Sequence, residues 1–328
     1  MASSSTSSSR RVFFAKLVVF ALVTIGLDAG VGSLLRHYYF KQVAGLNYRT
    51  TYAVEQSRDD IIILGSSRAQ AHYVPSILES GLGGTCYNAG RNGQSLLYAA
   101  AVHHSILARQ APRVVILDLI PTDFFQYHGH YDRLAALLPY YKDTEAVRPF
   151  VRLRSRLEPV KLLSRIYPFN SLPLQIIKYN LVPPAQDKGF IAQHGRIRLP
   201  LHPPKGRAWL VNGLDPQMLD AFTELVATCQ ENGIELYPVI SPAFPGKMFG
   251  EDAVSELERI LEGTPYRLWN YADHPEFVLN TELFSDRDHL NQDGAEAYTK
   301  IVVDRINAQP APVSIDRRAS LSGTAKPK

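Results

Sequence analysis

The sequence predicts an α/β fold, a three-layer sandwich with a central parallel sheet, preceded by one transmembrane helix. Short apolar runs alternate with longer segments of helical periodicity, which is typical of a parallel sheet covered by helices on both faces. The apolar run from Leu17 to Leu35 is about as long as a helix that spans the hydrocarbon core of a bilayer. A Pro-rich and aromatic-rich region at about 126–212 breaks the alternation, so we expect an insertion there.

The first strand is expected at Ile61–Leu64, where four apolar residues, three of them β-branched, indicate burial on both faces. The same kind of pattern predicts further strands at Cys86–Ala89, Val114–Leu119, Ile234–Ile240 and Arg267–Tyr271. Helices are expected at Val74–Ser80, Gln94–Gln110, Pro216–Asn232, Val254–Leu261 and Gln292–Ala308. The insertion is expected to cover the carboxyl end of the sheet, where lids and binding loops occur.

The N-terminal part predicts a membrane anchor. Residues 1–11 form a serine-rich leader that we expect to be disordered, and residues 12–41 are expected to be a transmembrane signal anchor. A cleaved signal peptide is the alternative, but the apolar run is long and Arg36–Phe40 makes a poor cleavage site. Asp28 inside the run suggests a contact with a partner or a functional role. The expected location is the cytoplasmic membrane, single-pass, with the following domain facing the periplasm or the outside.

The remaining boundaries follow from composition. A linker is expected at 42–58, one domain at 59–308, and a disordered tail at 309–328, which is rich in Pro, Ser, Gly and Lys. The chain of 328 residues, 45% of them hydrophobic, can bury a sizeable core. The net charge of +4 is mild. The sequence has no stripe of Lys and Arg with interleaved aromatic residues, so we expect no nucleic-acid partner. Cys86 and Cys229 lie in apolar segments, as buried free thiols do.

Two distant polar stretches suggest a nucleophilic site. Gly65-Ser66-Ser67-Arg68 follows the first strand directly, at the end of a parallel strand where open α/β sheets bind ligands. Taken alone, the two serines could simply cap the next helix. Asp286 and His289 are three residues apart, a spacing at which a carboxylate can hold one imidazole nitrogen and leave the other free as a base. Ser67 would then be the nucleophile.

These stretches resemble the SGNH (GDSL-like) hydrolases, in particular membrane-anchored bacterial members with a Gly-Ser-Ser first block. The resemblance covers roughly residues 58–128 and 232–308, and it also includes Asn88-Ala-Gly-Arg-Asn-Gly93 after the second strand. It implies an SGNH/flavodoxin-like fold, with Ser67, Asp286 and His289 as catalytic residues and the N–H groups of Ser67 and Gly93 in the oxyanion hole. Asn92 could add a weaker donor.

Two departures from the family pattern affect the expected activity. Ser66 stands where the family usually has an aspartate, and Thr122 in Ile120-Pro-Thr-Asp123 replaces an asparagine that normally donates to the oxyanion. Thr122 is therefore a weak oxyanion donor at best. Arg68 and Arg91 are candidates for binding an anionic part of the substrate.

The resemblance implies a membrane-anchored serine esterase or O-acyltransferase that acts on acyl esters of a cell-envelope glycan or polysaccharide. The alternative is a catalytically inactive SGNH-like module that binds an envelope polymer or a membrane acyltransferase. We expect no metal and no organic cofactor, because His128-Gly-His130 lacks a third ligand at familiar spacing and no phosphate-binding or dinucleotide-binding loop occurs.

Overall fold

The computed structural model describes residues 5–198, 212–246 and 250–309, and it confirms an α/β domain built on a parallel sheet. The sheet has five strands in the order β2-β1-β3-β4-β5. Their bounds are β1 Ile61–Leu64, β2 Cys86–Asn88, β3 Val114–Asp118, β4 Glu235–Ile240 and β5 Trp269–Asn270. Each neighbouring pair is parallel. All five strands lie where the apolar runs predicted them, with ends shifted by one or two residues.

Alternate residues of the strands face two separate hydrophobic cores, because side chains along a strand point to opposite faces. Ile62 and Leu64 of β1 belong to one core with α5 (Leu96–Leu107), α10 (Pro216–Glu231) and α11 (Glu251–Leu261). Ile61 and Ile63 belong to the other core. The helices of that second core are α3 (Ser67–His72), α4 (Pro75–Leu82) and α12 (Gln292–Asn307). The sheet is thus buried on both faces.

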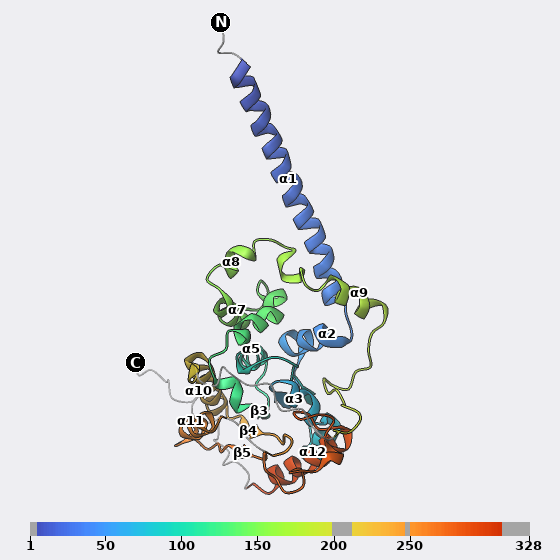
Figure 1. Cartoon of the computed structure of the whole chain (residues 1–328), viewed down its shortest axis with the longest axis vertical. Helices are drawn as coiled ribbons and strands as arrows, with labels where there is room; N and C mark the ends of the chain where they lie inside the picture. Colours follow the sequence, from blue (N-terminus) through green and yellow to red (C-terminus); the bar gives the residue numbers. More distant parts are fainter. Residues whose placement is uncertain (1–4, 199–211, 247–249, 310–328) are drawn as a thin grey trace, which may run out of the picture.

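The insertion as far as α9 lies mainly on α5 and on the end of α1 (Figure 1), while residues 188–197 bond β2, α3 and the loop before α12. Its expected position over the carboxyl edge of the sheet stays a prediction, because residues 199–211 lie outside the described residues. Many of its aromatic and leucine side chains, such as Leu137, Tyr140 and Phe150, are buried in the α5 core, while Phe190 and Ile197 join the other core. Its α-helices are α6 Gly129–Arg133, α7 Arg148–Arg154, α8 Glu158–Lys161 and α9 Pro173–Leu181. Shorter 3₁₀ turns are η2 Pro121–Phe124 before the insertion, and η3 Leu134–Tyr140, η4 Glu145–Val147 and η5 Tyr167–Phe169 within it.

The segment expected to be a linker is folded. It forms α2 (Gly45–Thr51) and a π-helical turn η1 (Tyr52–Gln56), in which Ala53 and Val54 are buried against the α5 core. Arg49 bonds the carbonyl of Gly189 and the side chain of Gln70. The polar residues of this segment favoured the prediction of a solvated linker. In the fold, polar side chains such as Arg49 bond to residues far away in sequence, and these bonds replace the hydrogen bonds to water that a linker would make.

A single long helix, α1 (Ser5–Phe40), leads into the domain (Figure 1). Residues 5–11, expected to be disordered, form its first turns, since adding a turn to an existing helix is much easier than starting one. Its stretch Ser9–Phe40 has a mean hydropathy of 2.1 over the best 18-residue window and no burial there. That length and composition suit a membrane anchor or a signal sequence. Of the expected disordered tail, residues 310–328 lie outside the described residues.

Asp28 of α1 is held by the insertion. Its carboxylate accepts hydrogen bonds from the Ser164 hydroxyl at 2.5 Å and from the N–H groups of Arg165 and Ile166 at 2.8 and 3.3 Å. One turn further along α1, a Cβ on Gly32 would lie 2.4 Å from the backbone of Arg165, so glycine is needed for this approach. The contact predicted for Asp28 is therefore made within the chain.

Candidate active site

Ser67 begins α3 directly after β1, at the carboxyl end of the central strand pair. The turn between them needs Gly65, whose φ is +142° and whose missing Cβ would lie 2.5 Å from the carbonyl oxygen of Asp118. Ser66 occupies the N-cap position, but its side chain makes no capping hydrogen bond. The Ser66 side chain therefore does not cap the helix. Ser67 is half-buried in the first turn of α3.

Asp286 and His289 form the pair that their spacing predicted. The Nδ1 atom of His289 lies 2.9 Å from each carboxylate oxygen of Asp286. The same carboxylate accepts the backbone N–H groups of Asp288 and His289 at 2.8 and 3.0 Å. Burial alone would raise the pKa of Asp286, but the hydrogen bonds and the charge of His289 outweigh it and hold this pKa below its ordinary value. The carboxylate thus fixes the imidazole, and Nδ1 is not the nitrogen left for proton transfer.

The loop that carries this pair is fixed at both ends. Phe284 and Leu290 form an antiparallel bridge that closes it, and the Asn291 side chain caps α12 by accepting the N–H of Gly294 at 3.0 Å. The cap of α12 and the Asp286–His289 pair therefore coexist in the same loop. The loop has little freedom to turn His289 away.

Two side chains of α3 tie the Ser67 helix to the His289 loop. The Nε2 atom of buried His72 accepts the N–H of Leu290 at 3.0 Å, and the ring edge of His72 faces the His289 ring at a centroid distance of 6.3 Å. Arg68 lies 3.5 Å from a carboxylate oxygen of Asp288. The two predicted halves of the site, more than 200 residues apart in sequence, are thus neighbours. None of the described hydrogen bonds joins Ser67 to His289.

A buried polar group lies behind these residues. Since His72 accepts at Nε2, its Nδ1 carries the proton and donates to the Ser241 hydroxyl at 3.0 Å. Burial lowers the pKa of His72 well below the usual histidine value, so this ring is neutral at pH 7. Asp118, at the end of β3, accepts the Tyr73 hydroxyl at 2.7 Å. Burial raises the pKa of Asp118 to about 6, although the hydroxyls of Ser241 and Tyr73 partly counter it.

The second block, Asn88–Gly93, is held against the first. The N–H of Arg91 donates to the carbonyl of Gly65 at 3.1 Å, and the Asn88 amide bonds the carbonyls of Ala69 and Tyr73. Gly93 has φ +74° and open space around its Cβ direction. Its role as an oxyanion donor stays a prediction. The N–H of Asn92, a weaker candidate, donates at 3.1 Å to Gln70.

Other predicted site residues are engaged elsewhere. Arg68 is buried, with its guanidinium 3.5 Å from a carboxylate oxygen of Asp288 and 3.5 Å from the carbonyl of Ser241, and its role in substrate binding stays a prediction. Arg91 bonds Thr50 and lies over the ring of Tyr98, on the side of α2, where it lines a separate cavity of about 340 Å³. Thr122 is buried in the 3₁₀ turn after β3. Its neighbours Ile120 and Asp123 line a small cavity with Ser66 and Asp118.

Sequence reasoning missed His72, Asp118 and Ser241. The polar residue at the end of each buried strand was an available signal for Asp118 and Ser241, while nothing in the pattern around His72 indicated its contact with Leu290. Within the described ranges, no group of three His, Cys, Asp or Glu side chains is placed to hold a metal ion. No protein-family model matches the chain, and no curated protein is significantly similar to it.

Proposed function

We propose that this protein is a membrane-anchored serine esterase or O-acyltransferase of the SGNH type, acting on acyl esters of a cell-envelope glycan or polysaccharide. The observation that carries the proposal is the Asp286–His289 pair, on a loop tied by His72 and Arg68 to the helix that Ser67 begins. The two buried faces of the parallel sheet support the three-layer arrangement of such a domain.

In the proposed reaction the Ser67 hydroxyl attacks the acyl carbonyl carbon while His289 Nε2 takes the hydroxyl proton. A tetrahedral oxyanion forms, and it collapses when the C–O bond to the alcohol breaks and His289 returns the proton to that alcohol. Water or a second hydroxyl then attacks the acyl-serine with the same imidazole as base. Water gives hydrolysis, and a sugar hydroxyl gives transfer. Asp286 stabilises the imidazolium and stays ionised, in keeping with its lowered pKa.

The oxyanion is proposed to be held by the N–H groups of Ser67 and Gly93. Ser67 lies in the first turn of α3, where N–H groups have no acceptor within the helix. Each such donor contributes about 2.7–4 kcal/mol to the stabilisation of the transition state. A third donor is weak, because Pro121 has no N–H and Thr122 has only a hydroxyl where the family has an amide.

The direct test is labelling of the detergent-solubilised full chain with a fluorophosphonate, which reacts with activated serines. Wild-type protein should be labelled at Ser67, and Ser67→Ala and His289→Ala should each lose labelling and lower kcat on a short-chain ester by at least roughly 10³-fold. Ser66→Ala is the matched control and should keep both. Unchanged labelling in Ser67→Ala, or loss in Ser66→Ala alone, would assign the nucleophile to Ser66.

A catalytically inactive SGNH-like module that binds an envelope polymer or a membrane acyltransferase is the second candidate. Two observations favour it: Ser67 and His289 share no hydrogen bond among the described residues, and the third oxyanion donor is replaced. Absence of fluorophosphonate labelling in folded wild-type protein, with retained binding of an envelope glycan, would establish this candidate instead.

A further inference from the structure

Several large apolar side chains of the insertion are exposed close to α1. They lie on and beside α8 and α9, at the end of the domain from which α1 extends (Figure 1). Their exposed fractions lie between 55 and 83%, for Leu157, Val160, Leu163, Leu174, Ile177 and Leu181. Soluble surfaces scatter such residues singly, whereas a gathering of them at one end indicates an interaction surface. We call these six residues the apolar rim.

The position of the rim along α1 indicates what covers it. A bilayer core needs about 20 residues of helix, and counting from Leu17, the residue after Lys16, its far edge falls near Arg36. Asp28 then lies inside the core, yet the insertion reaches it through Ser164, Arg165 and Ile166. Leu163, exposed by 78%, directly precedes this contact. The segment at Asp28 therefore lies below the membrane surface, and Leu163 lies with it. Asn180 of α9 bonds the carbonyl of Tyr38, at the far edge of the counted core, so the apolar side chains of α9 lie at the membrane surface.

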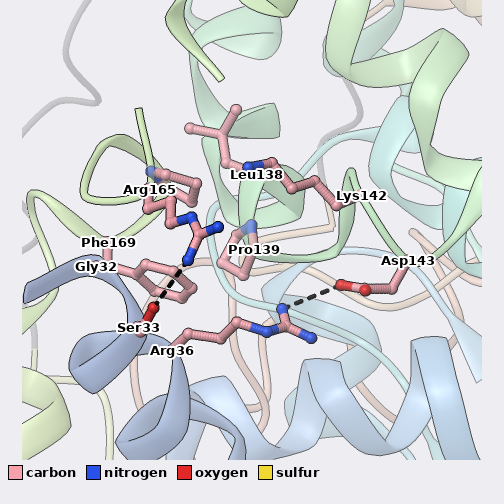
Figure 2. A pocket seen from close by; sticks show the side chains of 10 residues that line it. Gly32, Ser33, Arg36, Leu138, Pro139, Lys142, Asp143, Arg165 and Phe169 are labelled. Carbon is pink, nitrogen blue, oxygen red and sulfur yellow. Dashed lines mark hydrogen bonds and ion pairs between the residues drawn. The ribbon is translucent and has the colours of Figure 1, made fainter. Parts of the chain in front are cut away.

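A basic cavity adjoins the rim where α1 would leave the bilayer. Figure 2 shows Arg36, Lys142 and Arg165 around a hollow of about 370 Å³ between α1 and the insertion. Arg36 pairs with Asp143 at 3.0 Å, and Arg165 donates to Ser33 at 3.3 Å. Three cationic side chains and one carboxylate line this cavity, so its lining carries two positive charges in excess. Apolar side chains, Leu138, Pro139 and Phe169, line the same cavity. This combination suits a phosphate group attached to an acyl chain.

We propose that the apolar rim is embedded in the outer part of the bilayer and that the Arg36–Lys142–Arg165 cavity binds the phosphate headgroup of an anionic phospholipid. The occupant is the membrane and not a protein, because the insertion contacts α1 at Asp28, inside the stretch counted as the bilayer core, and α9 packs against α1 near its end. The proposal rests on the membrane anchoring proposed above. It places the domain directly against the membrane surface, in place of a domain suspended on a flexible linker.

The rim is tested by single cysteines carrying an environment-sensitive fluorophore on the full chain in liposomes of phosphatidylcholine and phosphatidylglycerol. The native thiols of Cys86 and Cys229 are buried and stay unlabelled. Leu163→Cys and Leu174→Cys should emit at short wavelength and be quenched by lipid-attached spin labels. Val23→Cys in α1 is the positive control, and Lys300→Cys, exposed on α12, is the aqueous control.

The outcomes separate this proposal from the anchor itself. Quenching at Val23 with none at Leu163 and Leu174 would overturn the membrane-embedded rim and leave the anchor intact. No quenching at Val23 would overturn both. Quenching at all three positions, with none at Lys300, supports the proposal.

The headgroup cavity is tested by native mass spectrometry of the full chain extracted from the same liposomes. Wild-type protein should retain phosphatidylglycerol in preference to phosphatidylcholine. Replacing two surface cations in Lys142→Gln/Arg165→Gln should lower that preference by roughly 30-fold, and Lys142→Arg should preserve it. Equal retention of both lipids by wild-type protein, or an unchanged preference in the double variant, would overturn the cavity assignment.

Discussion

His72 links the residues of the candidate site to one another. It lies five residues after Ser67 on α3, and its Nε2 atom accepts the backbone N–H beside His289. Because the ring is neutral and buried, it orients the His289 loop without itself taking part in proton transfer. His72 is therefore a positioning residue.

Replacing His72 by Phe removes the acceptor of the Leu290 N–H and the donor to Ser241. A displacement of His289 of about 1 Å costs roughly 10²-fold in turnover, so kcat on a short ester should fall by that order with little change in KM. His72→Gln, which keeps an acceptor, should retain more activity, and His128→Phe at an exposed site should be neutral. Thermal unfolding of His72→Phe measures how much of the variant is folded. If its kcat falls only in proportion to the folded fraction, the positioning role is contradicted.

Asp118 gives a pH dependence of stability. Its pKa in the folded state is about 6, above the ordinary value of 3.8, so the folded protein holds this proton more tightly than the unfolded chain does. Stability from this group is therefore present below about pH 4 and is lost as the pH rises through 6. The shift of about two units corresponds to about 3 kcal/mol.

Asp118→Asn cannot ionise and should escape that loss. The free energy of unfolding of the variant relative to wild type should therefore rise by about 2.4 kcal/mol between pH 4 and pH 7.5, because the unfolded carboxyl is already partly ionised at pH 4. The free energies of unfolding are measured by denaturant titration at the two pH values. Any packing cost of the amide is the same at both pH values and cancels in this comparison. A difference that does not change with pH would show that Asp118 is already ionised in the fold.

At the scale of the elements, the Asp28 carboxylate holds the loop at 164–166 of the insertion against α1. Asp28→Ala removes the protein acceptor of the Ser164 hydroxyl and of the N–H groups of Arg165 and Ile166. The loop should then open, and trypsin should cleave the solubilised variant after Arg165 faster than wild type. Asp28→Asn should lie between the two. Thr24→Ala, whose hydroxyl bonds only within α1, should match wild type, and equal cleavage in all four proteins would exclude the contact.

The strands and the Asp286–His289 pair could be predicted from sequence because each depends on residues close together in the chain. Ile61–Leu64 is apolar throughout, and a spacing of three residues suffices to bring Asp286 to His289. The fold of residues 45–56 could not be predicted in this way. Its polar side chains are buried by partners such as Gln70 and Gly189, far away in sequence. The contacts of Arg68 with Asp288 and of Arg91 with Thr50 could not be predicted for the same reason, since a charged residue gives no local sign of its distant partner.

For the whole molecule, the property to test is whether α1 anchors the domain in a membrane. Ser9–Phe40 exposes most of its large side chains, and leaving each Val, Leu, Ile or Phe in water costs about 1.5–3 kcal/mol relative to burial. The full chain should therefore stay in the membrane fraction after an alkaline carbonate wash. Protease added outside the cytoplasmic membrane should degrade the domain beyond residue 42 and leave the N-terminal turns protected. A tag placed before Ser5 gives the internal control, since it should be cleaved only after the membrane is opened with detergent. A soluble product beginning near residues 30–40 would show that α1 is a cleaved signal sequence, and a tag cleaved in sealed cells would reverse the orientation.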